Sequence, residues 1–388
     1  MIDYSSVLNP EVTEIKPSGI RKFFDIAASM EDVISLGVGE PDFQTPWLIR
    51  KAGIAAFEGG KTKYTSNSGL MELRKAVTEF LERKYRLSYD PEKEVLITVG
   101  GSEAIDAAIR AVVSEGDEVI IPQPSYVCYE PITRLAKGVP VIIETKAEDD
   151  FKLTAHDLKA AISPKTKVLI LPYPCNPTGA IMEKKDLEEI AKVLKNTNIV
   201  VISDEIYSEL TFGSDHVSFA SIEGMKERTV TVNGFSKTFS MTGWRLGYAC
   251  APREILSQMT KIHQFAIMCA PTVSQYAAVE ALRHGDEAIA SMKEEYNRRR
   301  KLTVSSFNEI GLTCREPKGA FYAFPSIQKS GLSCDEFCER LLKEKHVAIV
   351  PGTAFGKGGE GFVRASYCYS TEHLIEAISR IDEFLRSL

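Results

Sequence analysis

"EVLITVGGSEAI", residues 94–105, joins a run of apolar residues to two glycines and then to a stretch with apolar residues at helical spacing. The run predicts a β-strand, and residues 102–115 predict the helix that follows it. Similar apolar runs predict strands at 118–124, 167–174, 198–207 and 228–236, and an amphipathic stretch predicts a helix at 185–195. Because strands and helices alternate here, we expect an α/β fold with a mostly parallel sheet and helices on its faces, in three layers.

The length of the chain predicts more than one domain. With 388 residues it exceeds what a single hydrophobic core usually supports. A long stretch with helical periodicity, at about 272–310, leads into a C-terminal segment of mixed α and β character. We expect this segment to combine with the N-terminal residues into a smaller α+β domain. The predicted division is a small domain of residues 1–45 and 286–388 and a large domain of residues 46–285.

Composition and charge argue against several classes of protein. Lysine and arginine number 47 against 53 aspartate and glutamate, which gives a net charge of −6 and no general attraction to nucleic acid or to an anionic membrane. The sequence shows neither an apolar run of membrane-spanning length nor a signal-peptide pattern, so we expect a cytoplasmic protein. The eight cysteines are scattered, and Cys334 and Cys338 have neither a second pair nor a histidine in register. We therefore expect no disulfide framework and no metal site.

Two loops at predicted strand ends have the composition of ligand-binding loops. Gly100, Gly101 and Ser102 lie where a strand gives way to a helix, so free amides and the helix dipole favour a phosphate there. Asn176 lies among three prolines and a glycine in "PYPCNPTG" (172–179), which fixes its side chain for hydrogen bonding. Each loop also has a structural explanation, as a tight turn in the first case and a proline-rich turn in the second.

An acidic pair follows another predicted strand. Asp204 and Glu205, in "ISDEIYSEL" (202–210), come just after its apolar residues, so at least one carboxylate is expected at the edge of the sheet. Desolvation makes an unpaired charge costly at such a position, which predicts a cationic partner. Capping of a helix by Asp204 is the alternative explanation.

Lys237 is the residue that most strongly indicates a catalytic function. It lies in "NGFSKTFSMTGWRLGY" (233–248), eight positions before Arg245. Partial burial and a neighbouring cation lower the pKa of a lysine and make it a useful nucleophile, and an arginine binds phosphate with a planar fork. A lysine on a polar surface loop is the alternative, but the flanking Phe235 and Trp244 are not typical of such a loop.

Pyridoxal 5′-phosphate is a single ligand that accounts for all of these residues. Its aldehyde, phosphate and pyridinium nitrogen suit Lys237, Arg245 and Asp204 in turn, and the amides of the glycine turn also suit the phosphate. Its phenolic oxygen suits Asn176 and Tyr207. The combination is more specific than any of its parts.

The sequence also resembles a known family. The motifs that carry the resemblance occur in the expected order along nearly the whole chain: "SLGVGEPDF" (35–43), "KYTSNSGLMELR" (63–74), "CNPTGA" (175–180), "SDEIY" (203–207), "SKTFSMTGWRLGY" (236–248), "PKGAFYAFP" (317–325) and "FVRASY" (362–367). They are similar to those of fold-type I aminotransferases, in the aspartate aminotransferase superfamily, which use pyridoxal 5′-phosphate. The resemblance implies the same reaction and the same fold, with a small domain formed by both termini.

Roles for individual residues follow from the resemblance. Lys237 is expected to bond covalently to the cofactor and to move the proton at the substrate α-carbon. Asp204 is expected to keep the ring nitrogen protonated, and Tyr126 to stack on the ring. Asn176 and Tyr207 are expected to hold the phenolic oxygen.

Phosphate and substrate contacts follow in the same way. The phosphate-binding residues that the resemblance implies are Gly101, Ser102, Ser236, Arg245 and, from a neighbouring subunit, Tyr64, which predicts a homodimer with shared active sites. Arg364 is expected to bind the substrate α-carboxylate, assisted by Asn176 and Gly39. Many relatives have a phosphate-binding serine where this chain has Gly234, three positions before the lysine, so Ser236 is expected to replace it.

Substrate choice is less determined than the reaction. Strings such as "LNPEVTEIKPSGIRKF" (8–23) are similar to those of bacterial aromatic and N-acetyl-diaminopimelate aminotransferases, which use 2-oxoglutarate as acceptor. We rank these two kinds of L-amino acid donor nearly level and aspartate third, and we expect Ile20 to contact the donor side chain. Two other functions stay open. A cysteine-conjugate β-lyase uses the same residues, and a non-catalytic regulator would need a DNA-binding segment, of which the sequence shows no sign.

Overall fold

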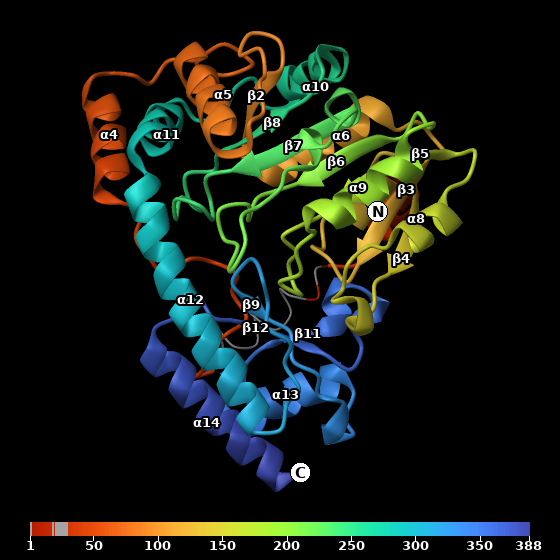
Figure 1. Ribbon diagram of the computed structural model, residues 1–388, viewed down its shortest axis with the longest axis vertical. Helices are drawn as coiled ribbons and strands as arrows, with labels where there is room; N and C mark the ends of the chain where they lie inside the picture. Colours follow the sequence, from red (N-terminus) through yellow and green to blue (C-terminus); the bar gives the residue numbers. More distant parts are fainter. Residues whose placement is uncertain (1, 18, 20–29) are drawn as a thin grey trace.

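A seven-stranded sheet forms the centre of the computed structural model, which describes residues 2–17, 19 and 30–388 (Figure 1). The strand order is β2-β8-β7-β6-β5-β3-β4, and neighbours run parallel except β8, which is antiparallel to both β2 and β7. The strands are β2 (Val95–Thr98), β3 (Glu118–Gln123), β4 (Val139–Glu144), β5 (Thr166–Leu171), β6 (Val200–Asp204), β7 (Thr229–Gly234) and β8 (Gly247–Cys250). The mostly parallel sheet that the sequence predicts is confirmed.

Two of these strands, β8 and β4, are missing from the sequence analysis. β8 has only four residues, Gly-Tyr-Ala-Cys, too few and too poor in β-branched side chains to be recognised. β4 is an edge strand, and Pro140 interrupts its apolar pattern, which an edge position tolerates. Because β7 and β8 are antiparallel neighbours, the connection between them turns back and holds Lys237 and Arg245 at the same edge of the sheet.

Helices cover both faces of the sheet, because successive side chains of a strand point to opposite sides. In β5, Val168 and Ile170 pack into the core on one face, and Leu169 and Leu171 pack into the core on the other. The first face is covered by α6 (Gly101–Val112), α7 (Tyr129–Leu135) and α10 (Arg253–Ala266). The second is covered by α5 (Met71–Tyr85), α8 (Ala155–Ala161), α9 (Lys184–Leu194) and α11 (Thr272–His284), with α4 (Trp47–Glu58) packed against α11. The predicted three-layer arrangement is thus confirmed.

The C-terminal part of the chain forms a smaller α+β unit below the sheet in Figure 1. β1 (Ile34–Ser35) pairs in parallel with β10 (Val347–Ala348), and β9 (Tyr322–Ala323), β12 (Val363–Ser366) and β11 (Val350–Pro351) form an antiparallel sheet. The helices α12 (Asp286–Glu309), α13 (Cys334–Lys345) and α14 (Thr371–Ser387) pack against these strands around a core of their own. Short 3-10 helices occupy Ala147–Asp149, Phe219–Ser221, Lys226–Arg228, Gln328–Ser330, Gly352–Phe355 and Lys357–Gly359.

The periodic stretch at 272–310 is two helices, α11 and α12, that meet at Gly285. A Cβ at this glycine would lie 2.4 Å from the carbonyl oxygen of Ala281 and 2.6 Å from the ring of Phe239, so a side chain does not fit. Beyond it, α12 runs from the sheet to the C-terminal unit (Figure 1). None of the helices in the described part of the chain, α12 included, is long and apolar enough to cross a membrane.

The N-terminal residues contact both parts of the molecule. α1 (Tyr4–Val7) is followed by α2 (Pro10–Thr13), which packs against α7 beside the sheet, whereas β1 joins the C-terminal unit. The division of the chain at residues 45 and 286 stays a prediction. Ile20, for which the sequence analysis expects a contact with the donor side chain, lies outside the described residues.

Candidate active site

A cavity of about 760 Å³ opens at the carboxyl end of the sheet, the edge where open α/β sheets bind their ligands. Loops that follow β2, β3, β5, β6 and β7 contribute to its wall, and so does β12 of the C-terminal unit. Apart from Tyr64, and from Ile20 outside the described residues, the wall contains all the site residues that the sequence predicts: Gly39, Gly101, Ser102, Tyr126, Asn176, Asp204, Tyr207, Ser236, Lys237, Arg245 and Arg364. Residues from both ends of the chain are thus gathered in one place.

Lys237 lies in the wall of this cavity, just beyond the fully buried strand β7. Its Nζ donates a hydrogen bond to the carbonyl oxygen of Gly39 at 2.5 Å. Burial lowers the pKa of Lys237 from 10.5 to about 8, and the guanidinium groups of Arg364 and Arg245 act in the same direction. The amine is therefore half neutral near pH 8, more than two pH units below an ordinary lysine, and the neutral form is the one that a nucleophile or a base requires.

Asp204 is the last residue of β6, and its carboxylate is buried against neutral donors. One carboxylate oxygen, Oδ2, accepts a hydrogen bond from the hydroxyl of Tyr129 at 2.7 Å, and Oδ1 accepts one from the backbone N–H of Ile206 at 3.2 Å. Burial raises the pKa of Asp204. A cationic group in the cavity would favour the charged carboxylate and lower that pKa again.

A cradle for an anion lies at the start of α6. Gly100 precedes the helix with a φ of +82°, and no side chain caps the amides of the first turn, which begins at Gly101 and Ser102. Arg245 lies so close that a Cβ at Gly100 would be 2.7 Å from its Nη2. The amides, the positive end of the helix dipole and the guanidinium together fit a phosphate. Ser236 lines the same cavity.

A side chain at position 234, where the resemblance implies serine, would conflict with its neighbours in this structure. A Cβ at Gly234 would lie 2.9 Å from Cδ1 of Ile206 and 3.2 Å from Cα of Gly247 in the adjacent strand. A side chain at this position would require its neighbours to shift. Ser236, which already lines the cavity, offers a hydroxyl without that conflict.

Arg364 is a buried arginine that donates to neutral oxygens. It is 2% exposed, and its guanidinium donates to Oδ1 of Asn176 at 2.8 Å and to the carbonyl oxygen of Gly37. Its Nε is buried and has no hydrogen-bond partner among the described residues. The guanidinium carbon lies 4.4 Å from the ring centre of Tyr322 and 4.8 Å from that of Phe355. A desolvated guanidinium in this state is a strong binding site for a carboxylate.

Tyr322 is a cavity residue to which the sequence analysis assigns no role. Its hydroxyl is 2.9 Å from that of Tyr207, and its ring lies beneath Arg364. Burial raises its pKa to about 12. A Cβ at Gly39 would be only 2.0 Å from this hydroxyl, so the position needs a glycine. Tyr322 belongs to the quoted motif "PKGAFYAFP", but nothing in that string reveals its contacts.

Tyr129 is the second such residue. Tyr126, which is expected to stack on the ring, belongs to the string "PSYVCY" (124–129) and lies in the cavity wall. Tyr129 begins α7, packs edge to face against Tyr126 at 6.0 Å, and donates to Asp204. The only sequence signal was a second tyrosine three positions further along the same string.

Tyr64 lies outside the cavity and is 81% exposed. The loop around it is nevertheless fixed, since Thr272 donates to the carbonyl oxygen of Lys63 at 2.8 Å and Asn67 donates to that of Met268 at 2.8 Å. Its role in a neighbouring subunit stays a prediction. Within the described ranges, no group of three or more His, Cys, Asp or Glu side chains is arranged to hold a metal ion.

Comparisons with known proteins agree on one family. A family profile described as "Aminotransferase class I and II" matches residues 31–381. The Bacillus subtilis relative YugH, which carries the name of an aminotransferase without a substrate, is 52% identical over 98% of this chain and 99% of its own. An aspartate aminotransferase of Pyrococcus abyssi is 48% identical over 96% of each chain. A B. subtilis protein named "Probable N-acetyl-LL-diaminopimelate aminotransferase" is 44% identical over 98% of this chain and 96% of its own.

A solved structure extends the likeness to the fold and to a third substrate class. The aromatic aminotransferase from Pyrococcus horikoshii OT3 superimposes with a TM-score of 0.90 at 45% identity, covering 95% of this chain and 99% of its own. The names of these similar proteins thus include aspartate, aromatic and N-acetyl-diaminopimelate aminotransferases. They agree on the reaction and differ in the donor.

Proposed function

Because the chain belongs to the class I and II aminotransferases, we propose that it moves an amino group from an L-amino acid to 2-oxoglutarate, with pyridoxal 5′-phosphate, by a ping-pong mechanism. One observation carries the proposal. Among the described residues, a single cavity holds an amine of lowered pKa, two guanidinium groups whose acceptors are neutral oxygens, and a carboxylate whose partners are neutral. These charges suit a ligand that has an aldehyde, a phosphate, a ring cation and a carboxylate-bearing substrate beside it.

The cofactor supplies an aldehyde for the lysine and a ring that accepts electrons from the substrate α-carbon. The residues proposed to hold it are Gly101, Ser102, Ser236 and Arg245 at the phosphate, Asp204 at the ring nitrogen, Asn176 and Tyr207 at the phenolic oxygen, and Tyr126 on the ring face. The fit is supported by the uncapped amides of α6 and by the neutral hydrogen-bond partners of Asp204, which within the described residues are Tyr129 and the backbone of Ile206.

Lys237 is proposed to carry the proton at the substrate α-carbon. A base is most effective when its pKa lies near the operating pH, and burial brings the pKa of this amine to about 8. The carbonyl oxygen of Gly39 holds Nζ at the cavity wall. Tyr129 holds Asp204 in a fixed orientation, so the carboxylate needs little rearrangement to stabilise a cation.

Arg364 is proposed to bind the α-carboxylate, which every amino acid has. Asn176 orients the guanidinium through the bond to Nη1. This contact fixes the substrate but cannot distinguish one donor from another, so the donor side chain must be recognised elsewhere. The rank order proposed for donors is aromatic amino acids and N-acetyl-L,L-diaminopimelate together, with aspartate third.

Product analysis tests the proposed reaction. Purified protein is given each donor with 2-oxoglutarate, and the expected products are glutamate and the corresponding keto acid. Borohydride reduction should fix the cofactor to the peptide that contains Lys237. Pyruvate and ammonia from a cysteine conjugate, formed without a keto-acid acceptor, would support a β-lyase instead. Fixation to another peptide would refute the assignment of Lys237.

A homodimer with shared active sites is also proposed. Tyr64 stands in a fixed loop on the surface, and the exposed apolar side chains of the protein include Trp47 and Phe57 of α4 and Phe265 of α10. A second copy that covers this surface would bury them and receive Tyr64 at its phosphate site. Mixing Lys237→Ala protein with Tyr64→Phe protein should restore activity, because one hybrid site then contains neither substitution. A monomer in sedimentation would refute the proposal.

A further inference from the structure

Residues 36–45, which we call the crossing segment, connect the C-terminal unit to the loop that contains Lys237. At one end, Leu36 bonds through its backbone to Ala348 at 2.8 Å and to Ser366 at 2.7 Å. At the other end, the hydroxyl of Thr45 donates to the carbonyl oxygen of Ser240 at 2.6 Å. Each end is therefore attached to a different part of the molecule.

The middle of the crossing segment presents backbone carbonyl groups to the cavity. Gly37 accepts from Arg364, and Gly39 accepts from Nζ of Lys237 at 2.5 Å. The two cations to which the proposed function assigns the substrate and its proton thus rest on the same short segment. A shift of the segment would change the surroundings of both.

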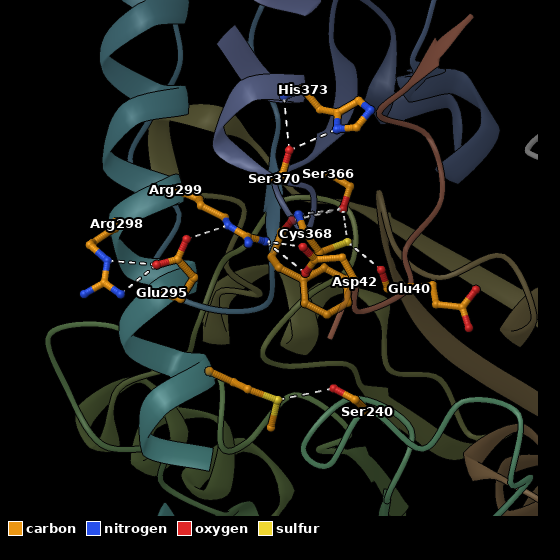
Figure 2. Close-up of polar contacts among 12 residues, drawn as sticks. Glu40, Asp42, Ser240, Glu295, Arg298, Arg299, Ser366, Cys368, Ser370 and His373 are labelled. Atoms are coloured by element: carbon orange, nitrogen blue, oxygen red, sulfur yellow. Dashed lines mark hydrogen bonds and ion pairs between the residues drawn. The ribbon is translucent and has the colours of Figure 1, made fainter. Parts of the chain in front are cut away.

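An ion pair fixes the segment three residues beyond Gly39. Figure 2 shows Arg299 reaching from α12 to Asp42, and Nη1 of Arg299 donates to both carboxylate oxygens at 2.9 and 2.8 Å. Nε of Arg299 donates to Glu295 at 2.9 Å, and the guanidinium lies 5.3 Å from the ring centre of Phe43. The side chains of Arg299 and Asp42 are 8% and 28% exposed.

The position of this pair matters more than its contribution to stability. Burying a guanidinium has a desolvation cost that the attraction of its partners only partly offsets, so a buried ion pair is weak evidence for stabilisation. The helix that carries Arg299, α12, also contacts the loop that contains Lys237, because Ser240 of that loop donates to Sδ of Met292 at 3.3 Å (Figure 2). α12 therefore fixes the position of the crossing segment relative to the loop that contains Lys237.

We propose that Arg299 is a positioning residue for Lys237: its bonds to Asp42 fix the crossing segment, so that the carbonyl group that accepts from the lysine stays in place. The inference rests on the proposed role of Lys237 and goes beyond it by adding a residue that touches neither substrate nor cofactor. Loss of the ion pair would let the carbonyl oxygen of Gly39 withdraw and leave the ammonium form of the lysine with one acceptor fewer.

Because charged and titratable groups surround Lys237, the test must distinguish a direct electrostatic effect of the ion pair from its effect on the position of the crossing segment. Burial has the largest influence on its pKa, followed by Cys368 and Glu40, which raise it, and by Arg364 and Arg245, which lower it. If the ion pair acted on Lys237 directly through its electric field, removing one member would shift the pKa of the lysine in the opposite direction from removing the other. Removing the cation at 299 would raise the pKa of Lys237, and removing the anion at 42 would lower it. Positioning through the segment predicts that both changes lower it.

The experiment measures the titration of Lys237 in cofactor-free protein, by competitive labelling with acetic anhydride and mass spectrometry of the peptide. Arg299→Met and Asp42→Asn should each lower the midpoint by about one pH unit, the size expected for loss of a hydrogen bond to a charged group. The double variant should shift no further than either single variant, because Arg299 acts through Asp42. Circular dichroism and thermal unfolding show whether each variant is folded.

Arg298→Met is the matched control, since Arg298 is the adjacent arginine of α12, 62% exposed, and pairs with Glu294 and Glu295. Its midpoint should equal that of the wild type. Arg299→Lys retains a donor for Asp42, so its midpoint should lie close to that of the wild type. This variant also keeps the test possible if Arg299→Met does not fold. Opposite shifts in the two single variants, unchanged midpoints, or additive shifts in the double variant would overturn the proposal. Because the lysine is titrated without cofactor, these outcomes are independent of borohydride fixation at Lys237, which tests the proposed function.

Discussion

Asp204 and Glu205 are adjacent carboxylates at the end of β6, and the protein treats them in opposite ways. Glu205 is 1% exposed and accepts hydrogen bonds from Ser203, Ser218 and the backbone of Phe219, while His216 lies 3.0 Å from its other oxygen. Within the part of the chain that the structure describes, Asp204 has a tyrosine hydroxyl and one backbone amide as partners, and it lines the cavity. Groups of the protein therefore supply the hydrogen bonds of Glu205, whereas Asp204 keeps the capacity to accept a hydrogen bond from a ligand.

Two buried arginines show the same contrast. Arg299 bonds to two carboxylates, those of Asp42 and Glu295, whereas Arg364 donates to an amide oxygen and a backbone carbonyl oxygen and has an unpartnered Nε. Of these two arginines, the one that lines the cavity is the one whose hydrogen bonds go to neutral oxygens. Four predictions test this distinction.

The largest effect is expected at Lys237. Lys237→Ala removes both the covalent attachment and the base, so turnover should fall by more than about 10⁴-fold, the upper range for general acid–base catalysis alone. The protein should still fold, because the amine has no partner that the fold depends on. Steady-state kinetics and thermal unfolding measure the two properties. Near-normal turnover would remove Lys237 from the mechanism.

The two adjacent carboxylates should respond oppositely to amide substitution. Asp204→Asn keeps the shape but removes the charge, so turnover should fall by roughly 10²–10³-fold with little change in stability. Glu205→Gln breaks the fully bonded cluster, so the free energy of unfolding should fall by about 3 kcal/mol while turnover of the folded protein changes little. Kinetics combined with denaturant unfolding would show the pattern. The reverse pattern would mean that bonding does not separate the two roles.

Arg364→Lys sharpens the comparison between the arginines. Loss of the planar fork should cost about 2–4 kcal/mol in transition-state binding, equally for every donor. The measurement is kcat/KM for an aromatic donor and for N-acetyl-diaminopimelate, where both values should fall and their ratio should stay constant. Ile20→Ala, in contrast, should change that ratio. A changed ratio in Arg364→Lys and an unchanged one in Ile20→Ala would reverse the assignment.

The smallest effect concerns the stability of cofactor-free protein. The pKa of Lys237 in the folded protein, about 8, lies below its ordinary value of 10.5. The contribution of this residue to the free energy of unfolding is therefore fully present above pH 10.5 and is lost as the pH falls through 8. At pH 7 the wild type therefore contains a buried ammonium that destabilises it. Lys237→Met should raise the thermal midpoint by a few degrees at pH 7, and the gain should shrink between pH 8 and pH 10.5. A gain that is independent of pH would point to packing as its cause.

Much of the fold could be predicted because its signals are local. Apolar runs located β2, β3, β5, β6 and β7, and helical spacing located α6 and α9. β4 and β8 could not be found, since a proline interrupts one and the other has four residues with little β propensity. The long periodic stretch concealed the break at Gly285, which depends on contacts with Ala281 and Phe239.

The sequence by itself also determined the chemical groups of the proposed site, because Lys237, Asp204 and Arg245 directly follow recognisable elements or lie in recognisable motifs. It could not determine their partners. Tyr129 meets Asp204 across 75 positions, Tyr322 meets Tyr207 across 115, and Arg299 meets Asp42 across 257. Whether a buried charge is paired or left open depends on how distant segments pack, which no local pattern records. For that physical reason, only the tertiary structure decided which of two adjacent carboxylates faces the cavity and which is enclosed by the protein.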